Sequence, residues 1–252
     1  MEQKALIIGG GIAGLCTGVY LRKNGFETEI LEMNSIAGGL ATAWKRDGYT
    51  FENCIHWLVG SREGEELNAI WKEVFDIGRL DFYDGEIYQV IDPETREDFL
   101  SFRVFHFDPT FAPAGKTAVV CFIPTYNHEY WVSLRARDKA AYDREKERVA
   151  HAVVGVCEAR FPAAKGRIEE VDVATPATVV RYTGNWKGSM EGWLLTPATG
   201  FRQLPPVLPG LKGFYMAGQW LSPGGGLPSG LMTARIVSQR ICRDHGVKWQ
   251  AA

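Results

Sequence analysis

The chain has 252 residues, enough to bury a substantial core in one large domain or two small ones. Its formal net charge of -2 gives no electrostatic reason to expect nucleic acid or an acidic membrane surface as a partner. Five scattered cysteines predict reduced thiols, with no disulfide framework and no structural zinc. No apolar run reaches the roughly 20 residues that a transmembrane helix needs, so we expect a cytoplasmic protein that can still touch a membrane peripherally.

The N-terminal segment predicts a strand, a tight glycine turn and a helix. The apolar run ALII at 5–8 leads into Gly9, Gly11 and Gly14, spaced as G-x-G-x-x-G, and a helical pattern follows at 12–23. In such a turn the first glycine permits the bend, the second lets the backbone approach a pyrophosphate, and the third lets helix and strand pack closely. The N–H groups and dipole at the helix start would hold phosphates.

A second predicted strand, at 29–31, ends on Glu32, which lies where a dinucleotide fold places an acid on the adenosine ribose hydroxyls. A carboxylate there disfavours a 2'-phosphate and so argues against NADP. Strand, helix, second strand and acid in register favour a dinucleotide site over a plain glycine turn beside a solvated glutamate. Because NAD and FAD share this fingerprint, the pattern leaves the choice between them open.

Two further glycine clusters follow. The segment EMNSIAGGLATAW carries Gly38 and Gly39 shortly after Glu32, and YMAGQWLSPGGGLPSG carries five glycines near the C-terminus. The second of these predicts a strand at 214–217 that ends at Gly218, a loop, and a helix from about 228 to 240. A helix N-terminus in that position can stabilise negative charge on a bound group.

Together these motifs resemble those of FAD enzymes of the amine oxidase superfamily, and in particular phytoene desaturase-like and carotenoid isomerase-like NAD(P)/FAD-dependent oxidoreductases. Leu40 stands where that family commonly has arginine, and Gln219 stands where it often has aspartate. The resemblance extends to the segments GYTFENCIHWLVGS, FRVFHFDPTFAPAGKT and RYTGNWKGSMEGWLLTP.

The resemblance implies an α/β fold, with a Rossmann-like FAD-binding domain of the glutathione reductase type and a small α+β remnant of a substrate domain. The FAD-binding domain would be discontinuous, at 1–97 and 198–252, and the remnant would occupy 98–197. Because members of the family are much longer, we infer a large internal deletion near residues 92–100, natural or engineered. Such a deletion would leave the flavin more exposed, and the apolar surface freed by it would favour a homodimer.

The middle of the chain predicts two strands within 99–109 and 116–125, and an amphipathic helix between Asp138 and Phe161. The helix would pack on the two strands through one apolar face, while its charged residues form a solvated face. The face consists of Tyr142, Val149, Val153 and Val156.

The predicted cofactor is FAD, and the resemblance places its contacts at both ends of the chain. His56 is the candidate catalytic residue, because it can donate to the flavin or move a proton, although a structural histidine is the commoner case. No metal site is expected, because His106 and His128, in strand or loop context, and His151 lack a second ligand at metal spacing. The expected cofactor contacts are Gly9, Gly11, Ile12, Ala13, Gly14, Glu32, Met33, Gly38, Gly39, Leu40, Ala41, Thr42, Trp57, Gly218, Gln219, Gly225, Gly226, Leu227 and Pro228.

Two functions remain open. The first is an FAD-dependent oxidoreductase that transfers a hydride or electrons between flavin N5 and a small apolar, polyene-like substrate. The second is a truncated or minimal FAD-binding module without that catalytic activity, so the chain alone leaves open whether it is an enzyme. Tyr182, Trp186 and Trp193 either line a substrate or flavin face or act as core anchors, and the sequence favours neither.

Overall fold

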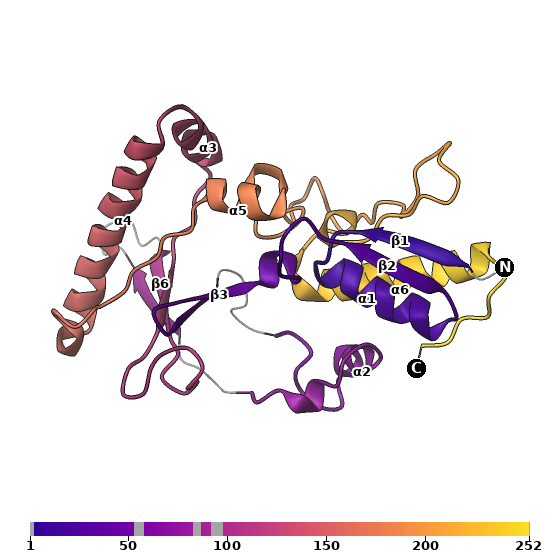
Figure 1. Ribbon diagram of the computed structural model, residues 1–252, viewed down its shortest axis with the longest axis horizontal. Helices are drawn as coiled ribbons and strands as arrows, with labels where there is room; N and C mark the ends of the chain where they lie inside the picture. Colours follow the sequence, from indigo (N-terminus) through magenta and orange to yellow (C-terminus); the bar gives the residue numbers. More distant parts are fainter. Residues whose placement is uncertain (1–2, 53–57, 83–86, 92–97, 252) are drawn as a thin grey trace. The chain divides into compact units, whose positions relative to one another are not determined.

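The computed structural model describes residues 3–52, 58–82, 87–91 and 98–251, and the chain forms two compact units (Figure 1). Each unit is discontinuous in sequence. The predicted domain boundaries at 97/98 and 197/198 stay a prediction. Unit 1 comprises Met1–Thr42, Cys54–Phe82 and Met190–Ala252, and unit 2 comprises Ala43–Asn53 and Tyr83–Ser189.

Unit 1 is built on a strand–helix–strand segment whose two strands pair in parallel (Figure 1). The pairing runs from Lys4 opposite Glu27 to Ile8 opposite Leu31. Helices from both ends of the chain pack together beside this sheet. The elements are β1 (Lys4–Ile8), α1 (Ile12–Lys23), β2 (Glu27–Leu31), α2 (Glu66–Lys72) and α6 (Gly226–Asp244), with short 3-10 helices at Gly39–Ala41, Ile77–Arg79 and Gln219–Leu221.

The two faces of the β1–β2 sheet differ in burial. On the inner face, a Cβ built on Gly18 of α1 would lie 3.1 Å from Ile30 and 3.5 Å from Ile7, so the helix packs directly on the strands. The outer face is open: Ile8 is 84% exposed and Leu31 is 48% exposed, and at its other end Lys4 forms ion pairs with Glu27 and Glu29. Parallel strands are normally covered on both faces, so this sheet has only half of its usual cover.

The turn between β1 and α1 depends on the absence of a side chain at Gly14. A Cβ built there would lie 2.0 Å from the carbonyl oxygen of Gly9, far inside van der Waals contact. Gly9 itself has φ of 103°, a conformation that glycine adopts without strain. The predicted roles of these two glycines in the turn are therefore confirmed by the geometry.

A carboxylate joins the three helices of unit 1. Glu73, at the C-terminal end of α2, accepts hydrogen bonds from the Tyr20 hydroxyl at 2.7 Å and from Arg235 Nε at 2.7 Å. Arg235 Nη2 also donates to the second oxygen at 3.1 Å. Burial and this carboxylate raise the pKa of Tyr20, and the hydrogen bond with Glu73 raises the pKa of Arg235. The network fixes α2 against α1 and α6.

The predicted strand at 214–217 is wrong, because this segment forms only an isolated bridge between Tyr215 and Val207. Beside this bridge, Met216 donates its N–H to the carbonyl of Pro206 at 2.8 Å. The neighbouring segment QLPPVLPG is rich in proline, and proline has no N–H with which to extend a ladder.

The described part of unit 2 contains a hairpin, a three-stranded antiparallel sheet and three α-helices. The predicted helix is present as α4, which packs Val153, Val156 and Cys157 against Leu100 and Phe102 of the sheet. Tyr142, which was expected on the same face, packs instead against Leu134 of α3 and Ala177 of α5. The elements are β3 (Ala43–Arg46), β4 (Tyr49–Glu52), β5 (Ile87–Ile91), β6 (Asp98–Val104), β7 (Val119–Phe122), α3 (His128–Arg137), α4 (Lys139–Arg160) and α5 (Pro176–Thr183), with 3-10 helices at Pro162–Ala164 and Trp186–Gly188.

Two expectations for unit 2 are corrected. His128 begins α3 and does not lie in a strand or loop. Tyr182 and Trp186 are not core anchors, because 51% and 58% of their surfaces are exposed, and each carries a neighbouring cation over its ring. In unit 1, Trp193 is 41% exposed and also lies outside the buried core.

The thiols of Cys16, Cys121, Cys157 and Cys242 are free, whereas Cys54 lies outside the described residues. Burial raises the pKa of Cys16 to about 11 and that of Cys121 to about 12, so both stay protonated at neutral pH. Within the ranges that the structure describes, no helix has the length and apolar character needed to cross a membrane.

The contact between Gly14 and Gly9 predicts the outcome of a single added methyl group. Gly14→Ala should lower the free energy of unfolding by about 1–3 kcal/mol, because the methyl group overlaps the Gly9 carbonyl. Urea denaturation measures this loss. The control is Gly155→Ala on α4, where a Cβ has open space and alanine favours the helix by up to about 1 kcal/mol. Equal stability of the two variants would disprove the proposed overlap.

The hydrogen-bond network around Glu73 predicts that two glutamate substitutions differ in their effect on the free energy of unfolding. Glu73→Gln should lower the free energy of unfolding by about 2–3 kcal/mol, because Arg235 and Tyr20 lose a largely buried charged acceptor. Glu63→Gln removes a carboxylate that is 90% exposed and paired with Lys72, which should cost under about 1 kcal/mol. Chemical denaturation of both variants at the same salt concentration compares them, and a loss no larger for Glu73→Gln than for Glu63→Gln would contradict the anchoring role.

Candidate functional site

The first glycine turn is tied to the end of β2. Gly9 donates its N–H to the carbonyl of Leu31 at 2.8 Å. The carboxylate of Glu32 then accepts the Gly10 N–H at 2.7 Å through Oε2. A Cβ on Gly10 would lie only 3.2 Å from this oxygen. The glycine turn and Glu32, which follows β2, are therefore held together by hydrogen bonds at the carboxyl ends of both strands.

Glu32 is held in its ionised form. Its Oε1 accepts the backbone N–H of Asn34 at 2.9 Å and the Asn34 side-chain amide at 3.0 Å. Hydrogen bonds from Asn34 and then Gly10 lower the pKa of this carboxyl below its usual range. Two of its hydrogen-bond donors are the backbone N–H groups of Gly10 and Asn34, so the carboxylate is fixed beside the turn.

The second glycine pair lies against the first turn. Gly38 donates its N–H to the carbonyl of Gly10 at 2.8 Å and forms an isolated parallel bridge with Gly11. A Cβ on Gly39 would lie 3.1 Å from the Cα of Gly11. Gly38, with φ of 130°, leads into the 3-10 helix formed by Gly39, Leu40 and Ala41, and Thr42 follows. The structure thus brings these predicted residues together.

Gly11 differs from its neighbours because no contact with another described residue requires glycine there. Its φ of -73° and ψ of 177° are accessible to any residue. A Cβ built on it has its nearest described neighbour at 3.9 Å, the Cα of Gly39. The space beside Gly11 is therefore open, at the N-cap of a 12-residue helix.

The start of α1 is suited to an anion. The helix has no side-chain N-cap hydrogen bond and no acidic residue in its first turn, which includes Ile12 and Ala13. Its first N–H groups and dipole therefore present positive potential beside Gly11. Met33, the predicted contact that follows Glu32, has 69% of its surface exposed.

The C-terminal glycine loop lies at the same helix start. A Cβ on Gly218 would lie 4.0 Å from the Cβ of Ala13, and one on Gly230 of α6 would lie 3.5 Å from the Ala13 nitrogen. Gly218 has φ of 132° and donates its N–H to Thr233 Oγ1 at 2.9 Å. Loops from opposite ends of the chain therefore meet at the N-terminus of α1.

The helix after the second loop begins slightly earlier than predicted. Its N-cap is Gly225, and Gly226, Leu227 and Pro228 form its first residues. Like α1, α6 has no side-chain N-cap hydrogen bond and no acidic residue in its first turn. Gln219 begins the 3-10 helix between Gly218 and the loop. Unit 1 thus contains two helix starts that lack acidic residues of their own.

Two of the predicted site residues, His56 and Trp57, lie outside the described residues. The part of the chain that the structure describes contains no group of three or more histidine, cysteine, aspartate or glutamate residues arranged to hold a metal ion. The sequence left the role of Trp193 open and did not predict that the segment 191–193 contacts the C-terminal loop at Gln219, Gly224 and Gly225. Its order Glu–Gly–Trp carries no periodic signal that would have revealed these contacts.

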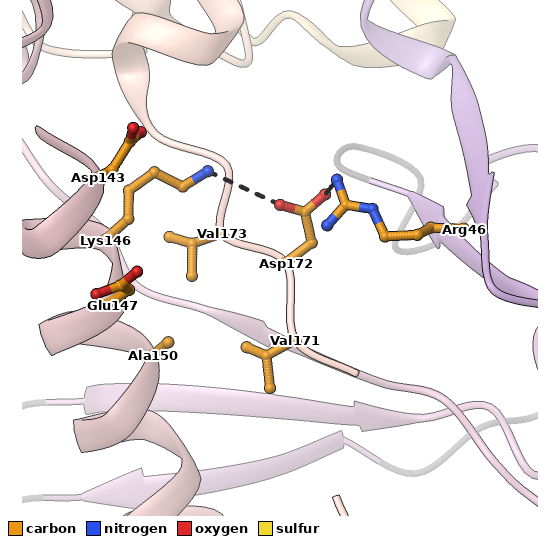
Figure 2. A pocket seen from close by; sticks show the side chains of 8 residues that line it. All are labelled: Arg46, Asp143, Lys146, Glu147, Ala150, Val171, Asp172 and Val173. Atoms are coloured by element: carbon orange, nitrogen blue, oxygen red, sulfur yellow. Dashed lines mark ion pairs between the residues drawn. The ribbon is translucent and has the colours of Figure 1, made fainter. Parts of the chain in front are cut away.

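Unit 2 contains a separate pocket of about 360 Å³ (Figure 2). Figure 2 shows Arg46 and Lys146 pointing toward Asp172 from opposite sides, with charged atoms 3.4 Å and 3.8 Å away. Asp172 also accepts the indole N–H of Trp44 at 3.1 Å. Because these charges compensate one another, we interpret them as a structural link, and every described cofactor candidate belongs instead to unit 1. Because these residues are far apart in the sequence, no local motif predicts the pocket.

Comparison with known proteins agrees with this geometry. Residues 7–74 match the family model described as an NAD(P)-binding Rossmann-like domain. A 1-hydroxycarotenoid 3,4-desaturase from a Flavobacterium species is 44% identical over 50 residues, which is 20% of this chain and 10% of the relative. Prolycopene isomerase 2, chloroplastic, from an Oncidium hybrid cultivar is 32% identical over 107 residues, 41% of this chain and 17% of the relative. A 15-cis-phytoene desaturase from Narcissus pseudonarcissus is 36% identical over 59 residues, 23% of this chain and 10% of the relative.

These matches confirm the predicted resemblance and the α/β, Rossmann-like fold class. The glutathione reductase-type detail and the internal deletion stay predictions. The matched segments cover 10–17% of the length of these three relatives. Residues 7–74 are therefore similar to an NAD(P)-binding Rossmann-like domain, and parts of the chain are homologous to carotenoid desaturases and prolycopene isomerases.

Proposed function

We propose that unit 1 binds FAD and that the protein is an oxidoreductase acting on an apolar, polyene-like substrate. Bound FAD would supply hydride or electron transfer at its N5 position. The three relatives are named as a 1-hydroxycarotenoid desaturase, a prolycopene isomerase and a phytoene desaturase, which supports a substrate of this class. Because the matches cover a small share of those proteins, activity and substrate are both part of the proposal.

The observation that carries the proposal is the open space at Gly11. Gly14 and Gly10 are glycines for internal reasons, since a Cβ on either would crowd Gly9 or Glu32. Gly11 has neither a special backbone conformation nor a crowding neighbour. A glycine at the N-cap of a helix, with space in front of it, is suited to the close approach of a pyrophosphate.

The remaining predicted residues fit the other parts of such a ligand. The ionised carboxylate of Glu32 can accept hydrogen bonds from ribose hydroxyls, and its negative charge disfavours a 2'-phosphate. Gly218 and Gln219 lie by the start of α1, where we assign them to the ribityl and phosphate region. We assign the first turn of α6 to the flavin ring, whose charge it can stabilise.

The second loop favours FAD over NAD. A dinucleotide fingerprint needs only the first strand, turn and helix, together with the acid after the second strand. Here a loop and helix from the far end of the chain also reach that helix start, through Gly218 and Gly230. Two helix starts within one unit suit a cofactor with two separate anionic regions. His56 stays the proposed proton-transfer residue and Trp57 a proposed contact.

One observation favours the second candidate function, an FAD-binding module without catalytic activity. The outer face of the β1–β2 sheet is uncovered, with Ile8 84% exposed, so the domain lacks a layer that parallel sheets normally have. Anaerobic mixing of the FAD-loaded protein with carotenoid precursors separates the two functions. Bleaching of the flavin absorption supports the oxidoreductase, and unchanged absorption with every precursor supports the module.

The assignment of Gly11 predicts a selective loss of cofactor binding. Gly11→Val should leave the thermal unfolding temperature of the free protein nearly unchanged but reduce FAD affinity at least about 100-fold, because the side chain fills the space for the pyrophosphate. Flavin fluorescence titration measures the affinity. Gly155→Val, also at a position with open space around its Cβ, should bind FAD like the unmodified protein.

Three outcomes would count against this proposal. Unchanged FAD affinity in Gly11→Val would refute the placement of the pyrophosphate. An unmodified protein that neither carries nor takes up FAD would refute the cofactor. Equal loss of affinity in the Gly155→Val control would show that the effect is not local to the turn.

A further inference from the structure

The loop at residues 208–214, which we call the projecting loop, exposes three large apolar side chains. Leu208 is 41% exposed, Leu211 is 54% exposed and Phe214 is 45% exposed. All seven residues of the loop are exposed, and in Figure 1 this part of the chain projects from unit 1 as an orange loop. Single exposed apolar residues are common on protein surfaces, whereas a group of them within one loop indicates a surface that contacts a partner.

Turns and a bridge hold the projecting loop in a defined conformation. Its ends are joined by the isolated bridge between Val207 and Tyr215. Within the loop, Leu211 donates its N–H to the carbonyl of Leu208 at 3.2 Å, and Phe214 donates its N–H to the carbonyl of Leu211 at 3.4 Å. The backbone is therefore fixed by its own hydrogen bonds, and folding of the loop leaves the three apolar side chains in water.

The projecting loop also carries a positive charge. Lys212 is exposed in the middle of the loop and has no ion-pair partner among the described residues. Although the net charge of the chain is -2, the sequence contains no aspartate or glutamate between Glu191 and Asp244. The same acid-free segment exposes a second pair of this kind, Phe201 and Arg202. The charge of this segment therefore favours an anionic partner.

The small size of the projecting loop favours a lipid surface over a protein partner. A stable protein–protein interface takes about 20–30 residues from each side, whereas this loop supplies seven. A bilayer needs no complementary surface, because its interface accepts a few apolar side chains beside a lysine that reaches the headgroups. Anionic headgroups add an attraction for each lysine or arginine near the surface.

We propose that the projecting loop docks unit 1 on an anionic lipid bilayer. Leu208, Leu211 and Phe214 enter the boundary between headgroups and acyl chains, and Lys212 contacts the headgroups. The docking needs no bound cofactor and does not depend on the proposed function. It adds a location to that function, because an apolar, polyene-like substrate dissolves in a lipid bilayer rather than in water.

Sedimentation with lipid vesicles tests the docking in the absence of FAD. The unmodified protein should bind vesicles of phosphatidylcholine and phosphatidylserine more tightly than vesicles of phosphatidylcholine alone. This difference should shrink in about 1 M NaCl, where the Debye length is about 3 Å. Leu211→Gln should weaken binding to both kinds of vesicle about tenfold. Lys212→Gln should weaken binding to the anionic vesicles about fivefold and leave binding to the neutral vesicles unchanged.

Two matched substitutions distinguish the loop from a general effect of the surface. Leu6→Gln removes a leucine of β1 that is 57% exposed, close to the 54% of Leu211, and should leave vesicle binding unchanged. Lys45→Gln removes an exposed lysine of unit 2 and should also leave it unchanged. Because all four side chains are exposed, none of the substitutions should unfold the protein, which its thermal unfolding temperature checks.

The docking proposal is wrong if any of three results is obtained. An unmodified protein that stays in the supernatant with both kinds of vesicle does not dock on lipid. Equal weakening by Leu6→Gln and Leu211→Gln would assign the lipid contact to the outer face of the β1–β2 sheet. If Leu211→Gln dissociates a dimer in analytical ultracentrifugation but leaves vesicle binding unchanged, the loop contacts a second copy of this chain. FAD titration decides the proposed function separately, so each proposal can fail alone.

Discussion

The contact between the Gly14 Cα and the Gly9 carbonyl sets the position from which the rest of unit 1 is built. Because no side chain separates them, α1 begins directly at the end of β1. The Gly10 N–H then faces Glu32, and the Gly10 carbonyl faces Gly38. The start of α1 stays open to α6, whose Gly230 approaches the Ala13 nitrogen. One steric requirement therefore brings together segments from the first, second and last parts of the unit.

The glycines around this contact serve different purposes. Gly9, Gly38 and Gly218 adopt positive φ angles, a Cβ on Gly14 would overlap the Gly9 carbonyl, and a Cβ on Gly10 would make a tight contact with Glu32. For Gly11 neither reason applies among the described residues, so the fold described here does not itself require glycine at that position. This distinction separates the glycines that build the turn from Gly11, on which the proposed cofactor site depends.

Three charged groups illustrate how burial decides the role of a carboxylate. Glu73 is largely buried and paired with Arg235, so it fastens helices together. Asp172 lies between Arg46 and Lys146 in the pocket of unit 2 and likewise joins separate segments. Glu32 has backbone N–H donors at the end of β2, which keep it ionised and fixed at the candidate site. Only the last is placed next to an open helix start.

The sequence by itself determined the local features: the β1–turn–α1 unit, the acid after β2, the amphipathic α4 and the glycine loop before α6. Each depends on spacing within about 20 residues, which periodicity and glycine placement record directly. Tertiary structure alone decided that 214–217 pairs by a single bridge, that Tyr182 and Trp186 are exposed, and that Asp172 joins Arg46 to Lys146. It alone also brought the segment 191–193 to the C-terminal glycine loop. Those outcomes depend on which distant segments come into contact, and such contacts produce no periodic pattern in the sequence.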